Sequence, residues 1–275
     1  MWLARFRSTP APAVFTDRPD AAHFAVPFCH NCGAALETPF CGQCGQERAS
    51  RIGRRQVGAD FWDEWAPFGT DFLRAAARLL RQPGTVAREF VLGARRRHIN
   101  PFKLLLIGIA MLLLVLDQSN YLTSPDPAVA RAMEIMQAWA NGSFSLGLLA
   151  MLASTWLWFR SRGGYNLIEH LVLAAYGQFV VICVSILTKL PTLIWRDPAF
   201  LDAHIQVSRW LLELAGALVL AFACRQFFLL SWRRDGMRLT AALASFLTFK
   251  ALLIKTYGWL LVWLVLKPAL RAAGG

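Results

Sequence analysis

Four cysteines near the N-terminus provide the clearest chemical signal in the sequence. Cys29 and Cys32 form one CxxC pair, and Cys41 and Cys44 form a second pair after eight intervening residues. Four thiolates at this spacing favour tetrahedral coordination of one Zn²⁺ ion, with each pair holding one side of the ion. A site with four cysteine ligands has no open coordination position, so the pattern predicts a structural zinc ribbon over residues 28–46.

Two alternatives use the same four residues, namely iron coordination and a redox-active disulfide. The remaining cysteines, Cys183 and Cys224, lie alone in apolar stretches, which is not the layout of a disulfide framework. We expect both to pack as small apolar side chains.

The composition indicates a membrane protein. Of the 275 residues, 56% are hydrophobic and only 17% are charged, which excludes a disordered chain and argues against an ordinary soluble enzyme. Five apolar blocks follow the first hundred residues, each predicted to be a transmembrane helix: 99–116, 143–159, 167–190, 210–232 and 239–266. The fold prediction is therefore all-α, a multi-pass transmembrane helical bundle of about five spans over residues 99–275. The first block is short for a span, so four spans are the alternative.

Two segments flank the cysteine ribbon. Residues 1–27 are rich in alanine and proline and are predicted to be a flexible tail, with a short docked helix as the alternative. Residues 47–98 are predicted to be a basic amphipathic connector, with a helix over 70–81 that ends before Pro83.

The connector carries arginines beside an apolar helix face, a pattern typical of a helix in the membrane interface. Packing of this helix on the bundle or on another chain is the alternative. Six arginines are expected to face anionic lipid: Arg74, Arg78, Arg81, Arg95, Arg96 and Arg97.

Basic loops alternate with acidic or neutral loops along the apolar half. The basic loops contain arginines at 160, 162, 233, 234 and 238, whereas the loop after the first block is net acidic. Because basic loops stay in the cytoplasm, this alternation predicts a cytoplasmic N-terminus.

Three stretches resemble an uncharacterised family of bacterial multi-pass membrane proteins that carry an N-terminal zinc ribbon. The first is the cysteine segment FCHNCGAALETPFCGQCGQ, in which Gln46 follows the last CxxCG. The second is QPGTVAREFVLGARRRHINP at 82–101, and the third is YNLIEHLVLAAYGQF at 165–179. The resemblance implies a bacterial inner-membrane protein with a ribbon, and it implies no established activity.

Ionisable residues inside predicted spans are functional candidates by default. Glu169 and His170 open the third block, and we weigh a proton or cation site against a pair that orients the helix and meets the arginine-rich segment. Glu213, Lys250 and Lys255 lie in the last two blocks. Glu213 and Lys255 are predicted to pair across these helices, either as a structural contact or as part of an ion pathway.

These features predict a non-enzymatic scaffold or regulatory protein whose ribbon recruits a protein partner to the membrane. No catalytic motif occurs in a context that would support it, and the ribbon is not basic, so no nucleic acid is expected. A small transporter or channel that uses the intramembrane charges is the alternative. A lipid-modifying enzyme has only Glu169 and His170 in its favour.

Overall fold

The computed structural model describes residues 18–53, 70–119, 140–195 and 197–266, which are helical apart from the N-terminal ribbon and the connections. The helices are α1 (Ala21–Phe24), α3 (Thr70–Arg81), α4 (Pro83–Val91), α5 (Pro101–Gln118), α7 (Ala140–Phe159), α8 (Leu167–Lys189), α9 (Pro191–Ile194), α10 (Pro198–Phe227), α11 (Trp232–Leu261) and a π-helical turn (Val262–Leu266). Within the described ranges there is no strand, and only two isolated β-bridges occur, both in the ribbon.

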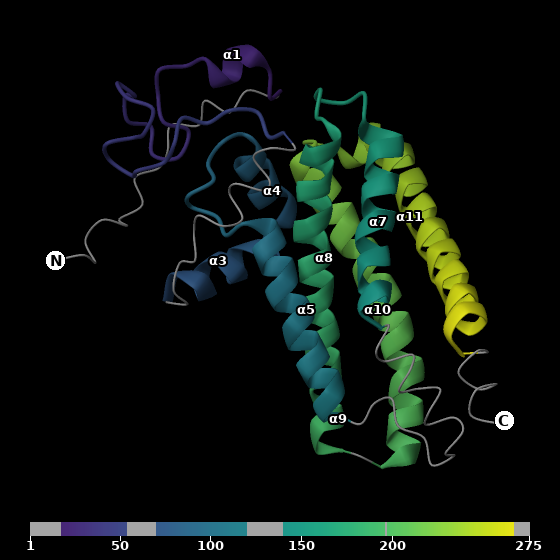
Figure 1. The fold of residues 1–275 in the computed structure, drawn as a ribbon. Helices are drawn as coiled ribbons and strands as arrows, with labels where there is room; N and C mark the ends of the chain where they lie inside the picture. The colour runs from purple at the N-terminus through teal and green to yellow at the C-terminus, as the bar shows by residue number, and fades with distance from the viewer. Residues whose placement is uncertain (1–17, 54–69, 120–139, 196, 267–275) are drawn as a thin grey trace.

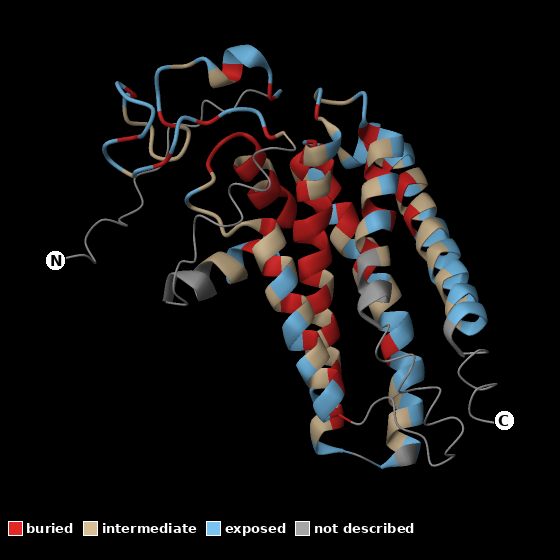
Figure 2. Ribbon diagram, in the orientation of Figure 1, coloured by how far each residue is buried: buried red, intermediate tan, exposed pale blue. Residues whose placement is uncertain are grey.

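The long helices α5, α7, α8, α10 and α11 run side by side, with the cysteine segment and α1 at one end (Figure 1). Helix α8 is at the centre and packs against α4, α5, α7 and α10. It is apolar on all sides, as expected for a central helix. In its most apolar window 61% of residues are buried, against 17% for α11, and Figure 2 shows the same contrast.

Four helices among the described residues are long and apolar enough to cross a membrane: Pro101–Gln118, Leu167–Ile194, Ala199–Phe227 and Trp232–Leu264. Large apolar side chains stay exposed on the last two, including Trp210 on α10. Such a surface is suited to lipid because hydrocarbon does not penalise it. The fold-class prediction is confirmed: the chain is helical, has helices of membrane-spanning type and carries an N-terminal cysteine cluster.

Two predicted spans differ from the helices observed. Helix α7 corresponds to the predicted block 143–159, but its described apolar part, Leu146–Phe159, is shorter than a full span. Helix α10 begins well before the predicted start at 210. The side chain of Asp197 accepts the Phe200 N–H at 3.1 Å and Pro198 occupies the first turn, so capping starts the helix before its apolar part.

Residues 18–27, predicted as part of a flexible tail, instead include the docked helix α1. Asp20 caps this helix by accepting the His23 N–H at 2.8 Å. The buried His23 ring then forms a hydrogen bond with the Leu92 carbonyl at 2.9 Å. This long-range contact, which local composition does not reveal, holds the segment in place. Residues 1–17 lie outside the described part.

The connector contributes α3 and α4, and α4 belongs to the bundle. Helix α3 covers the predicted residues 70–81, while residues 54–69 lie outside the described part. Helix α4 packs so closely on α10 that a Cβ at Gly84 would lie 2.1 Å from the Ala223 carbonyl oxygen. The Gly84 N–H also donates to Gln226 Oε1 at 2.9 Å. For α4, packing on the bundle is therefore the correct alternative.

Candidate metal centre

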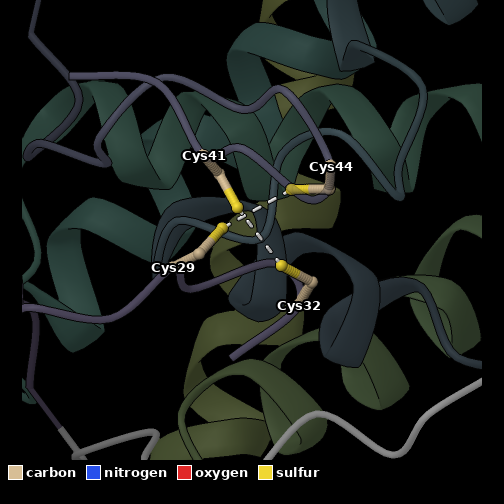
Figure 3. Close-up of side chains that lie close together, drawn as sticks. All are labelled: Cys29, Cys32, Cys41 and Cys44. Carbon is tan, nitrogen blue, oxygen red and sulfur yellow. Dashed lines mark hydrogen bonds between the residues drawn. The ribbon is translucent and has the colours of Figure 1, made fainter. Parts of the chain in front are cut away.

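The structure brings the four predicted cysteine ligands together (Figure 3). Their Sγ atoms all lie within 4.8 Å of one another, at 3.6 Å between Cys29 and Cys44 and 3.5 Å between Cys32 and Cys41. Four thiolates bonded to one ion at about 2.3 Å lie roughly 3.8 Å apart in a tetrahedron. None of the four forms a disulfide. The cluster can therefore hold a metal ion with little rearrangement.

The two CxxC segments are built alike. The sequence Pro-Phe-Cys opens both, at 27–29 and at 39–41. After each pair a glycine with positive φ, Gly33 at 76° and Gly45 at 70°, donates its N–H to the carbonyl of the first cysteine in its own segment. Glycine is favoured because side chains disfavour this left-handed conformation. The repeated Pro-Phe-Cys is the sequence signal of this internal symmetry, which was not among the predictions.

The protein environment shifts the pKa values of the cysteine thiols in different directions. Burial acts to raise the pKa of the Cys41 thiol, but hydrogen bonds from the backbone of Cys44 and Gln43 lower it to about 7. Burial raises the pKa of Cys32 to about 12 and also raises the pKa of Cys29. Because a metal ion binds thiolates, binding must release protons from the more basic thiols.

The ribbon docks on the loop between α4 and α5, residues 92–100. The buried Gln46 side chain makes two of the contacts: its Nε2 donates to the Gly93 carbonyl at 2.7 Å, and its Oε1 accepts the Arg96 N–H at 3.0 Å. An amide can donate and accept at once, so one side chain fixes both sides of the interface. In the sequence, Gln46 was noticeable only through the family resemblance.

The arginine run at 95–97 contacts the ribbon segment. The Arg95 side chain donates to the Ser50 carbonyl, and the Arg97 side chain donates to the Asn31 carbonyl between two of the cysteines. The loop turns back toward the cysteines, so these two guanidinium groups meet backbone carbonyls of the ribbon segment. Contact of the run with anionic lipid remains a prediction.

The arginines of α3 have separate environments. Arg78 forms an ion pair with Glu89 of α4 at 2.7 Å, and Arg81 is exposed. The Arg74 side chain lies outside the described part. Contact of this helix with anionic lipid remains a prediction.

A second joint connects the ribbon segment to the central helix. The Arg51 guanidinium binds the Glu169 carboxylate through two bonds, at 3.0 and 3.1 Å, and Asn166 Nδ2 donates to the Ile52 carbonyl at 2.9 Å. Asn166 and Glu169 also form the capping box that begins α8. The sequence Asn-x-x-Glu before an apolar run signals such a cap, which was not among the predictions. Glu169 thus orients the helix and meets an arginine.

The neighbouring His170 points elsewhere. Its ring is fully buried between Trp156 and Phe228, with ring centroids 5.4 Å from each. Neither ring nitrogen has a hydrogen-bond partner among the described residues. Glu169 and His170 therefore do not form a joint proton or cation site in this structure.

The charges of the last two helices pair differently from the prediction. Glu213 Oε1 lies 2.9 Å from Lys250 Nζ, whereas Lys255 is exposed. Because α10 and α11 run antiparallel from a short connection, residues equally distant from it lie at the same level (Figure 1). Lys250 is closer than Lys255 to the level of Glu213, so the predicted pairing of Glu213 with Lys255 is wrong. The pair links two helices, and transport through this region remains a hypothesis.

A carboxylate–histidine pair supports the docking loop. His98 Nε2 lies 2.8 Å from Glu89 Oε2, and both side chains are largely buried. Burial lowers the pKa of His98 despite the opposing effect of Glu89. Burial acts to raise the pKa of Glu89, but His98 and the arginines at 78 and 97 hold it below its ordinary value. At neutral pH the pair is therefore a carboxylate beside a neutral imidazole.

We predict that acid weakens the docking loop through this pair. A histidine whose folded pKa lies below its ordinary 6.5 favours the unfolded chain as the pH falls below 6.5. The stabilisation that Glu89 contributes is present above its ordinary pKa of 4.5. It is lost as the pH falls through the lower pKa of Glu89 in the folded protein. The apparent melting temperature should therefore fall between about pH 7.5 and pH 5.5, and less steeply in His98→Gln, which cannot become charged. Equal slopes in both proteins would contradict this role.

A family model described as a protein of unknown function (DUF3667) matches residues 70–113. The match begins at α3, includes α4 and the docking loop, and ends within α5. It does not reach the cysteines. The chain matches no curated protein and no solved structure. The chain is thus similar to a family of unknown function over the segment that receives the ribbon.

Proposed function

We propose that this chain is a non-enzymatic scaffold or regulatory protein of a bacterial inner membrane. In this proposal the four-cysteine ribbon holds one structural Zn²⁺ ion and recruits a protein partner. Zinc is favoured because four thiolates in a near-tetrahedral cluster are its usual structural ligands. A closed set of four ligands supplies rigidity and leaves no coordination position for a substrate.

The observation that carries the proposal is a pair of exposed phenylalanines on the ribbon. Phe28 is 54% exposed and Phe40 is 59% exposed, at equivalent positions of the two segments. Exposed aromatic side chains on a rigid unit are well suited to protein recognition, because little conformational entropy is lost on binding. The contacts that dock the ribbon on the bundle are made by Gln46 and Asn31, not by the two phenylalanines. Docking therefore does not explain why the aromatic pair is exposed.

The arrangement of charge supports a cytoplasmic ribbon. The ends of α7 and α10 and the start of α11 lie at the same end of the bundle as the ribbon (Figure 1). The exposed arginines at 160, 233, 234 and 238 belong to this end. Arginines concentrate on the cytoplasmic side of membrane proteins and can also interact with anionic lipid there.

The aromatic pair provides the test. We expect Phe28→Ser/Phe40→Ser to insert and to bind metal like the wild type, but to bind the partner at least about tenfold more weakly, the usual loss at a binding hot spot. Crosslinking and affinity purification from native membranes would identify the partner, and titration of the purified partner would measure the loss. Gln43→Ala, an exposed change in the same ribbon, is the matched control. Equal binding by both variants would contradict recruitment through the ribbon.

A further inference from the structure

An apolar groove of about 510 Å³ extends along α7. Helix α7 lies between α8 and α11 and packs against both (Figure 1). The described lining of the groove is entirely hydrophobic and comes from these three helices, including Ala153 and Trp156 of α7, Leu167 of α8 and Phe249 of α11. Because the lining belongs to apolar helices and offers contact to carbon rather than to charge, the groove favours a hydrocarbon ligand.

The length of the groove corresponds to one leaflet of a bilayer. Its α7 lining begins at Leu149 and follows one helix face to Trp156. Arg160 continues this face one turn later, and its N–H donates to the Trp156 carbonyl at 3.2 Å. An α-helix rises about 16 Å between Leu149 and Arg160, which is about half of the roughly 30 Å hydrocarbon core of a bilayer. The groove therefore has the length of one acyl chain, and it is too short for a further membrane-spanning helix.

Two exposed arginines lie at the same end of this groove. Arg160 follows the groove face of α7, and Arg238 lies eleven residues before Phe249, on the same face of α11. The Oγ atoms of Ser154 and Ser245 lie 3.0 Å apart and fix the register of the two antiparallel helices. Arg160 comes six residues after Ser154 and Arg238 seven residues before Ser245, so the two arginines lie at nearly the same level.

The arginine end of the groove resembles a membrane–water interface. Trp156 lines the groove one turn from Arg160, and tryptophan and arginine are typical of the level at which lipid phosphates lie. Asp235 lies one turn before Arg238, but its carboxylate is bound by Arg162 through bonds of 2.5 and 3.3 Å. Because this carboxylate is engaged by another arginine, the charges of Arg160 and Arg238 favour an anionic headgroup.

We infer that this groove binds an anionic phospholipid, with one acyl chain along α7 and the phosphate at the level of Arg160 and Arg238. Guanidinium groups donate paired hydrogen bonds to phosphate oxygens, while the hydrophobic lining contacts the chain. A hydrocarbon chain joined to an anion matches both ends of the groove, whereas a soluble anion would leave the lining unused. The inference rests on the proposed insertion of the helices in a membrane. It does not depend on a partner for the ribbon, so either proposal can fail alone.

The test uses the purified full-length protein in a neutral detergent. Its apparent melting temperature is followed during titration with phosphatidylglycerol, with phosphatidylcholine of the same acyl chains, and with glycerol phosphate, which has the charge without the chains. We expect phosphatidylglycerol to stabilise most and glycerol phosphate to have no effect at the same concentration. In Arg160→Gln and in Arg238→Gln, half-maximal stabilisation should each require about fivefold more phosphatidylglycerol. Ala153→Phe fills the groove from an exposed position and should abolish the difference between the two lipids.

Two control variants repeat these changes outside the groove. Ala244→Phe adds the same side chain at an exposed position of α11 that is not in the described lining. Arg233→Gln removes one charge from an exposed position about 140° around α11 from Arg238. Both should titrate like the wild type. If Arg233→Gln weakens the response as much as Arg160→Gln does, the attraction is diffuse and the inferred site is wrong.

Three other results would overturn the inference. Equal stabilisation by the two lipids would show that the headgroup is not recognised, and a wild-type response of Ala153→Phe would show that the chain does not lie in the groove. Light scattering that finds a dimer in the wild type and a monomer in Ala153→Phe would assign the groove to a second copy of the chain. If Ala153→Phe does not fold, the exposed Arg160 and Arg238 variants decide, and wild-type titration of both contradicts the site.

Discussion

Removal of the proposed Zn²⁺ ion is expected to unfold the ribbon while the helical bundle stays folded. The ribbon core within the described residues consists of the four cysteines with Ala34 and Leu36, which is too little apolar surface to fold alone. A structural zinc site supplies about 10–16 kcal/mol of apparent binding free energy, most of which is then folding free energy. Chelation, or Cys41→Ser, should therefore reduce the bound zinc from one ion per chain to none and make residues 28–48 sensitive to protease.

The bundle has its own core and should not follow the ribbon. Its buried residues are contributed mainly by α4, α7, α8, α10 and α11, so far-UV circular dichroism should change little on chelation. Cys183→Ser, which changes a cysteine outside the cluster, is the matched control and should retain one ion. A ribbon that stays protease-resistant after metal loss under reducing conditions would show that the metal does not hold the segment together.

Loss of the Glu169 carboxylate is expected to be the most destabilising single change at the joint between ribbon and bundle. The side chain is fully buried, accepts two bonds from Arg51 and closes the capping box of α8. Glu169→Ala leaves the Asn166 N–H and the Arg51 guanidinium without this acceptor, at a cost of about 2–4 kcal/mol. For a chain of this size, that lowers the apparent melting temperature by roughly 5–12 °C.

Graded variants separate the two roles of Glu169. Glu169→Gln keeps the cap but loses the charge, so we expect about half of the effect. Arg51→Gln should cost less still, because Arg51 is 42% exposed and water replaces part of the lost contact. Glu169→Gln and Arg51→Gln should both increase protease cleavage between residues 46 and 54. If Glu169→Ala melts like the wild type, the joint does not contribute to stability.

The parts of this protein that depend on residue type and short spacing were predictable from the sequence. The ligand set was predictable because four thiols at two CxxC spacings suit few other arrangements. The helical class was predictable because each apolar block must satisfy its backbone hydrogen bonds internally in lipid. Helix α3 was predictable from its helical period and from the proline that follows it.

How these parts contact one another depends on the tertiary packing of the whole chain. The docking of the ribbon depends on His23, Gln46 and Arg51 reaching partners far away in the chain, such as Glu169. Local composition does not record such contacts, so residues 18–27 were predicted as part of a flexible tail, and the contacts of Arg95 and Arg97 with the ribbon were not predicted. The partner of Glu213 depended on how far α11 is shifted along its axis relative to α10. Contacts between distant segments depend on how whole helices pack, and one sequence specifies that packing only through the complete set of side chains that fill the core.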